Sequence, residues 1–435
     1  MCRAALLAGF VFIAVAFAFG DFKGAFAPDI NHPAIEYATR QVTDPVSQLN
    51  LRIQQGRVHL KFDDAQGYLR SVLQALNVPI ESQLVVFSQT SFQMLRISPS
   101  NPRGLFFNDS VAVGWVRGGP IVELAAEDPR QGVIFYSLDQ KPAGQPQFVR
   151  RDDACLSCHE SIASVGVPGM LVRSVFPSPT GLPVAELGEY LTDDRSPFEQ
   201  RWGGWYVTGI TGSVRHMGNA IVTDSAKPES LLGDQTLNLE SLKGKFDTNA
   251  YLSPYSDIVA LMVFEHQMHM TNLFTRAGWE VRFSLYQDRM SDADTPENRL
   301  GVTDATVREA AREVVDYLLF VDEKPLTDEI RGTSGFAEMF SAQGPSDSKG
   351  RSLRQFDLKR RLMRYPCSYM VYSEAFDALP DEARDAIYAR MWRVLSGREK
   401  AGKYAKLSLA DRQAVVEILR ETKKGLPDYF QPPTD

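Results

Sequence analysis

Short apolar runs separated by turn-forming residues occupy the chain between residues 83 and 138. The runs cover residues 84–87, 105–107, 111–116, 121–125 and 133–138, and Pro, Gly, Asn and Asp stand between them. Short runs with this punctuation are typical of β-strands joined by turns. They predict a sheet in the first half of the chain, with further strands at 183–191 and 205–210.

The pattern becomes helical after about residue 250. Ser256 and Asp257 can cap a long helix reaching about residue 285, and residues 304–321 place their apolar side chains on one face. Other helices are expected at 68–76, 353–363, 381–395 and 409–423. The predicted fold class is α+β, with a β-rich region at 28–150, a segment with strands at 151–250 and an α-helical region at 251–435.

The N-terminus has the pattern of an export signal. Arg3 is followed by an uncharged apolar run at residues 4–20, and residues 25–27 have the small-x-small form of a cleavage site. The length of the run leaves both a cleaved signal peptide and a membrane anchor open for residues 1–27. Both alternatives predict an exported, periplasmic protein, with membrane contact only through this segment.

Composition narrows the possible functions. The formal net charge of −7 argues against a nucleic-acid-binding protein, which normally carries a basic surplus. Four cysteines in 435 residues are too few for a disulfide-rich scaffold. Cys2 belongs to the N-terminal segment, and Cys367 is expected to be a small buried apolar residue.

The other two cysteines form the motif Cys155-Leu156-Ser157-Cys158-His159, the C-x-x-C-H signature of covalent haem attachment. Thiols three residues apart can form thioethers with the two vinyl groups of one porphyrin, and His159 can then bind the iron. A thioredoxin-type dithiol would usually lack the histidine. A structural zinc site would need more ligands nearby. The motif therefore predicts one covalently bound haem c.

The stretch RRDDACLSCHESIASVGVPGMLVRSVFPSPTGLP, followed by RWGGWYVTGITGSVRHMGNA, resembles an uncharacterised family of exported bacterial mono-haem c-type cytochrome-like proteins. The similarity continues through NPRGLFFNDSVAVGWVRGG, IVALMVFEHQMHM and RYPCSYMVYSEAFDALP, and so covers most of the chain. It implies a redox role, with exported proteins as redox partners, and names no substrate. The chain does not resemble the small all-α class I cytochrome c.

The sixth ligand of the iron stays open at this stage. His216 and Met217 end a segment rich in glycine and aromatic residues, which could form the wall of a porphyrin site. His266 and His269 share one face of the predicted long helix, among several methionines. Met170 is another possible thioether ligand. Each of these side chains could equally be an ordinary core or strand residue.

Arginines near the motif in sequence could bind the haem propionates, because guanidinium groups bind carboxylates in a bidentate manner. The candidates are Arg173, Arg201 and Arg215. Electron transfer is the favoured function. The alternative is a haem enzyme that acts on peroxide or another small oxidant, with Arg215 and His216 at a labile distal position. A haem-based sensor is a third class that no residue favours.

Overall fold

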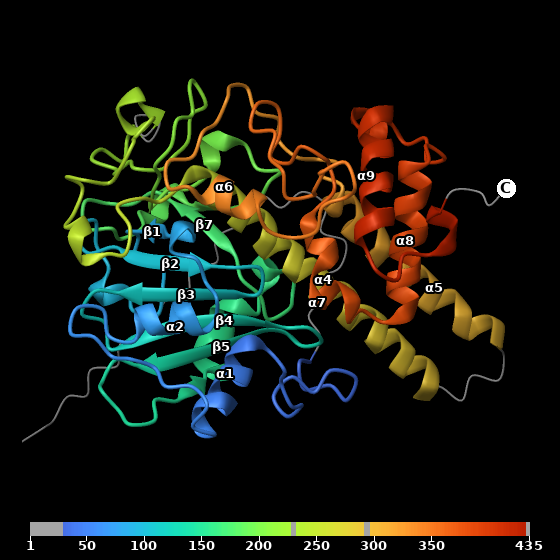
Figure 1. The fold of residues 1–435 in the computed structure, drawn as a ribbon, viewed down its shortest axis with the longest axis horizontal. Helices are drawn as coiled ribbons and strands as arrows, with labels where there is room; N and C mark the ends of the chain where they lie inside the picture. The colour runs from blue at the N-terminus through green and yellow to red at the C-terminus, as the bar shows by residue number, and fades with distance from the viewer. Residues whose placement is uncertain (1–28, 228–231, 291–295, 432–435) are drawn as a thin grey trace, which may run out of the picture.

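The computed structural model describes residues 29–227, 232–290 and 296–431, so the predicted signal or anchor at 1–27 lies outside the described residues. Its centre is a seven-stranded antiparallel sheet with the order β6-β5-β4-β3-β2-β1-β9 (Figure 1). The strands are β1 (Leu84–Val86), β2 (Arg103–Phe107), β3 (Val111–Val116), β4 (Ile121–Asp128), β5 (Gly132–Asp139), β6 (Phe148–Arg150) and β9 (Trp205–Tyr206). All of these strand pairs are antiparallel.

Both faces of this sheet are covered, because successive side chains point to opposite faces of a strand. On one face, Leu105, Phe107 and Ala112 join the core formed with the C-terminal helices. On the other face, Phe106 and Val113 pack against α1 (Pro45–Gln54) and α2 (Leu69–Ala75). This double burial explains why the strands read as continuous apolar runs and lack a simple alternation.

The helix α4 (Ile258–Met290) connects the sheet to the helical half, and most of its side chains are buried. The Asp257 carboxylate begins it by accepting hydrogen bonds from the backbone N–H groups of Val259 and Ala260. The helices α5 (Pro296–Leu318), α6 (Phe336–Ser341), α7 (Glu374–Asp377), α8 (Asp381–Leu395) and α9 (Leu409–Thr422) complete this half (Figure 1). The α+β class is therefore confirmed.

The segment between the two halves contains α3 (Asp152–His159) and a two-stranded sheet of β7 (Val172–Val175) and β8 (Glu189–Thr192). Much of the rest of it forms turns and short 3-10 helices, such as Ile162–Ser164. Within the described ranges, no helix combines the length and apolar character needed to cross a bilayer.

Two expectations about local structure were wrong, and one helix was not predicted. Residues 353–363 form turns, because the Asp357 carboxylate accepts the backbone N–H groups of Lys359 and Arg360 and so closes a tight turn. Residues 183–191 are a strand only from 189 onward. Helix α1, whose N-terminus is capped by Asp44, lies in a segment for which no helix was predicted. Local polar capping chemistry decided the first and third cases.

Candidate functional site

The C-x-x-C-H motif lies on α3, next to strand β5 of the main sheet. Cys155 is half-buried and Cys158 is exposed, and both are free thiols. Burial, followed by the nearby carboxylate of Glu123, raises the pKa of Cys155 to about 11, so its thiol is protonated at neutral pH. Two free thiols three residues apart on one short helix match what covalent haem attachment requires.

The partner of His159 fixes the position of its proton. The imidazole Nδ1 lies 2.9 Å from the backbone oxygen of Gly169. A carbonyl oxygen can only accept, so Nδ1 must donate and carry the proton. Burial also lowers the pKa of His159, which favours the neutral ring. The Nε2 lone pair is therefore left for a metal. Histidines that bind iron or zinc have this tautomer and donate their other ring N–H to a carbonyl or carboxylate in the same way.

The loop after α3 holds this arrangement in place. The Gly169 N–H donates to the His159 backbone oxygen at 2.9 Å. The Ser164 hydroxyl lies within hydrogen-bond distance of the same oxygen, at 3.0 Å, and closer to the Val167 oxygen, at 2.8 Å. The Phe135 ring of β5 lies 4.7 Å from the imidazole, centroid to centroid. His159 is thus fixed by its backbone, its ring nitrogen and an aromatic neighbour.

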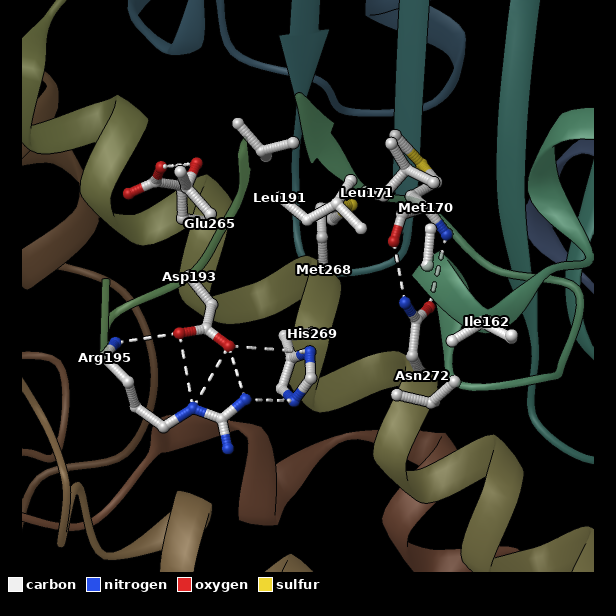
Figure 2. A pocket seen from close by; sticks show the side chains of 14 residues that line it. Ile162, Met170, Leu171, Leu191, Asp193, Arg195, Glu265, Met268, His269 and Asn272 are labelled. Carbon is white, nitrogen blue, oxygen red and sulfur yellow. Dashed lines mark hydrogen bonds and ion pairs between the residues drawn. The ribbon is translucent and has the colours of Figure 1, made fainter. Parts of the chain in front are cut away.

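Asn272 of α4 binds the same loop from the other side. Its Oδ1 accepts the Met170 N–H at 3.2 Å, and its Nδ2 donates to the Met170 backbone oxygen at 2.7 Å (Figure 2). Asn272 is 2% exposed, so both hydrogen bonds are sheltered from water. The long helix therefore positions the segment that orients His159.

A cavity of about 210 Å³ lies between this loop, the end of β8 and α4 (Figure 2). Its first lining residue in the sequence is Ile162, three residues after His159. The apolar part of its lining includes Ile162, Val165, Met170, Leu191 and Met268. The polar part includes Asp193, Arg195, Glu265, His269 and Asn272. An apolar pocket with a few convergent polar groups is the usual form of a ligand site.

Arg195 connects Asp193 to His269 at this cavity (Figure 2). Its Nε lies 3.1 Å from Asp193 Oδ2, and its Nη2 lies 2.9 Å from His269 Nε2. A guanidinium only donates, so His269 Nε2 accepts and the imidazole proton is on Nδ1. Burial and then the Arg195 charge lower the pKa of His269 to about 3, which keeps the ring neutral.

Glu265 is the buried carboxylate of the cavity. Its Oε1 accepts the Thr192 hydroxyl at 2.6 Å, and its Oε2 lies 3.2 Å from Arg201 Nη1. Burial raises its pKa to about 7, although Arg201 acts in the opposite direction. A carboxyl group that titrates near neutral pH beside a cavity marks a functional-site candidate.

The other histidines predicted as ligands have their acceptor nitrogens engaged. His266 Nδ1 lies 2.9 Å from the Asp194 carboxylate and its Nε2 lies 2.7 Å from the Ser368 hydroxyl. His216 Nδ1 accepts the Gly218 N–H at 3.1 Å, and burial lowers its pKa to about 4. Neither lines the cavity, and iron ligation by either would require these hydrogen bonds to rearrange.

The remaining predicted residues are also held by protein groups. Met217 accepts a weak hydrogen bond from Ser174 and packs away from the cavity. The candidate propionate-binding arginines pair with carboxylates: Arg173 with Glu189, Arg201 with Glu265 and Arg215 with Asp234. Met170 and His269 do line the cavity.

Arg195 and Glu265 were not among the residues predicted from the sequence. Glu265 had a detectable signal, because it is an acid within an apolar helix and lies four residues before His269, on the same face. Arg195 had none, since its role depends on the turn after β8. No cluster of three or more His, Cys, Asp or Glu side chains suited to a metal ion occurs in the described part of the chain.

Comparison with protein-family models, with curated proteins and with solved structures finds no match for this chain.

Proposed function

We propose that the protein is an exported c-type cytochrome that carries one covalent haem and transfers electrons. Cys155 and Cys158 would form the thioethers, and Nε2 of His159 would bind the iron. The observation that carries this proposal is the hydrogen bond from His159 Nδ1 to the Gly169 carbonyl, which leaves the coordinating nitrogen unprotonated. His216, His266 and His269 each have an acceptor nitrogen engaged by a donor.

The haem would supply a one-electron redox couple. The chain would contribute orientation and shielding. The hydrogen bond to Gly169 increases the basicity of the His159 ring and sets its direction. Asn272 stabilises the loop that provides this carbonyl. Such outer interactions, together with burial, are the means by which a protein adjusts the potential of a haem iron.

The experiment is expression with periplasmic export and haem-attachment machinery, followed by a haem stain of the denatured protein. Covalent haem should remain with the wild-type chain and with Cys367→Ala, whose thiol is buried in the core formed with the C-terminal helices. It should be lost from the double variant Cys155→Ala/Cys158→Ala. A wild-type protein without covalent haem would contradict the proposal. Reversible one-electron voltammetry of the haem-loaded protein tests electron transfer.

One observation favours a second function, reaction of the same haem with a small oxidant. Every histidine predicted for the distal side already uses its lone pair within the protein, whereas a cavity lies beside the attachment loop. Spectra of the reduced protein separate the two functions. Six-coordinate low-spin iron that does not bind carbon monoxide favours electron transfer alone. Binding of carbon monoxide favours the second function.

A further inference from the structure

We propose that the cavity beside the attachment loop is a binding site for a small anion, and that Arg195 selects it. This inference rests on the proposed haem, whose iron would have to border the cavity, and goes beyond electron transfer. The cavity is small, at about 210 Å³. Pockets for drug-sized ligands usually measure about 300–1,000 Å³, so the size indicates a ligand smaller than a typical drug molecule.

The position of the cavity connects it to the motif. Its lining starts at Ile162, three residues after His159, and includes Met170, whose neighbour Gly169 binds the His159 ring. Its opposite wall is the face of α4 that carries Glu265, His269 and Asn272 (Figure 2). A small molecule in this cavity would therefore lie between the haem-attachment loop and the central helix.

The carboxylate oxygens that line the cavity already accept hydrogen bonds from protein groups. Asp193 Oδ1 accepts the Arg195 backbone N–H at 2.8 Å, and its Oδ2 accepts Arg195 Nε and Nη2 at 3.1 and 2.5 Å. Glu265 accepts from Thr192 and Arg201. Both carboxylates are therefore held by protein donors.

Two donors remain at the cavity. Among the described residues, Arg195 Nη1 has no hydrogen-bond partner (Figure 2). The Arg195 side chain is 40% exposed, so molecules from solvent can reach it. The proton of His269 is on Nδ1, which lies 3.8 Å from Asp193 Oδ2, longer than a hydrogen bond. A ligand that satisfies both groups must accept hydrogen bonds, and an anion does so most strongly.

Arg195 can distinguish an anion from a neutral molecule of similar size. An anion gains a charge-assisted hydrogen bond from Arg195, whereas a neutral diatomic molecule of similar size gains almost nothing from that charge. Removal of the guanidinium should therefore weaken anion binding and leave neutral ligands unaffected. General damage to the cavity would weaken both.

The test uses the haem-loaded full chain and follows the Soret band during titration with azide, an anion, and with carbon monoxide, a neutral probe. We expect both to bind to the wild type. Arg195→Leu should weaken azide binding at least tenfold and change carbon monoxide binding less than twofold, with Arg195→Lys between wild type and Arg195→Leu for azide. Arg312→Leu is the matched control, because Arg312 is also ion-paired and 46% exposed but lies on α5.

If Arg195→Leu does not fold, Asp193→Asn provides a second measurement. It removes the carboxylate that neutralises Arg195, so azide should bind more tightly than to the wild type, and an unchanged affinity would contradict the inference. If covalent haem is present but azide does not bind, this inference is overturned and the proposed cytochrome function still stands. Equal weakening of azide and carbon monoxide also overturns it. A chain without covalent haem overturns both proposals.

Discussion

His159 and Gly169 bind each other twice: the imidazole Nδ1 donates to the Gly169 carbonyl, and the Gly169 N–H donates to the His159 carbonyl, each at 2.9 Å. The pair closes the loop after α3 and fixes the tautomer of the histidine. Because the same loop borders the cavity, its geometry links the proposed haem site to the proposed anion site.

Gly169→Ala should disturb this loop. A Cβ at this position would lie 2.2 Å from Asn272 Oδ1, so the amide that holds Met170 would have to move. Loss of a buried hydrogen-bond partner costs about 1–3 kcal/mol, and we expect a decrease of that size in the free energy of unfolding. Urea unfolding measures it. Gly402→Ala is the control, since nothing lies within 4 Å of its added Cβ. Equal stability of the two variants would contradict the prediction.

Arg201→Met should leave Glu265 buried without its ionic partner. Their side chains are 2% and 0% exposed. Removing one member of a buried pair costs about 3–5 kcal/mol when the other member stays charged. Arg201 lowers the Glu265 pKa to its wild-type value of about 7, so its removal raises that pKa further, and protonation of the carboxyl limits the cost.

The double variant Arg201→Met/Glu265→Leu should lose much less stability than the sum of the two single variants, as measured by a double-mutant cycle in urea at pH 8. Arg312→Met breaks an exposed pair and should change the stability by at most about 1 kcal/mol. Strict additivity at the buried pair would show that the two side chains are not coupled.

Ser368→Ala should destabilise the contact between α4 and the C-terminal segment. The Ser368 hydroxyl lies 2.7 Å from His266 Nε2, while the Asp194 carboxylate holds Nδ1. Removing the hydroxyl leaves a fully buried ring nitrogen without a donor, at a cost of about 1–3 kcal/mol in chemical denaturation. Ser348→Ala removes a hydroxyl bonded to Glu421 at the surface, where water can replace it, and should cost about 0.5 kcal/mol or less.

Periodicity predicted the regular part of the fold well. The strand at 111–116 and the helix at 381–395 have the predicted bounds, because turns or capping residues flank strongly apolar patterns there. It failed where side chains direct the backbone locally. Asp44 begins a helix in a segment of weak pattern, and Asp357 closes a turn where a helix was expected.

The candidate site, like the fold, could be predicted only in part from the sequence. The attachment motif is contiguous in sequence, so the residues that would hold a haem could be named without a structure. The cavity could not, because Arg195 and His269 are 74 residues apart and meet only through the packing of the turn after β8 on α4. Engagement of the acceptor nitrogen of His266 also depends on a tertiary partner, Ser368, 102 residues away. The acceptor nitrogen of His216 is engaged locally, by the backbone N–H of Gly218.

The buried His216 should make the protein less stable in acid. Burial lowers its pKa to about 4, against an ordinary value of 6.5, so the unfolded chain binds a proton between these values while the folded chain does not. The stability from the neutral ring is present above pH 6.5 and is lost as the pH falls through about 4. The full loss is about 3 kcal/mol, from 1.36 kcal/mol per pKa unit. His269 acts in the same direction.

His216→Asn should reduce this acid sensitivity, because asparagine can accept the Gly218 N–H but does not titrate. Urea unfolding between pH 4 and 8 should give a shallower slope of the unfolding free energy against pH for this variant, by up to one proton near pH 5. The exposed His59 is the control, and His59→Asn should keep the wild-type slope. A slope of His216→Asn that matches the wild type would show that His216 is not held neutral in the folded chain.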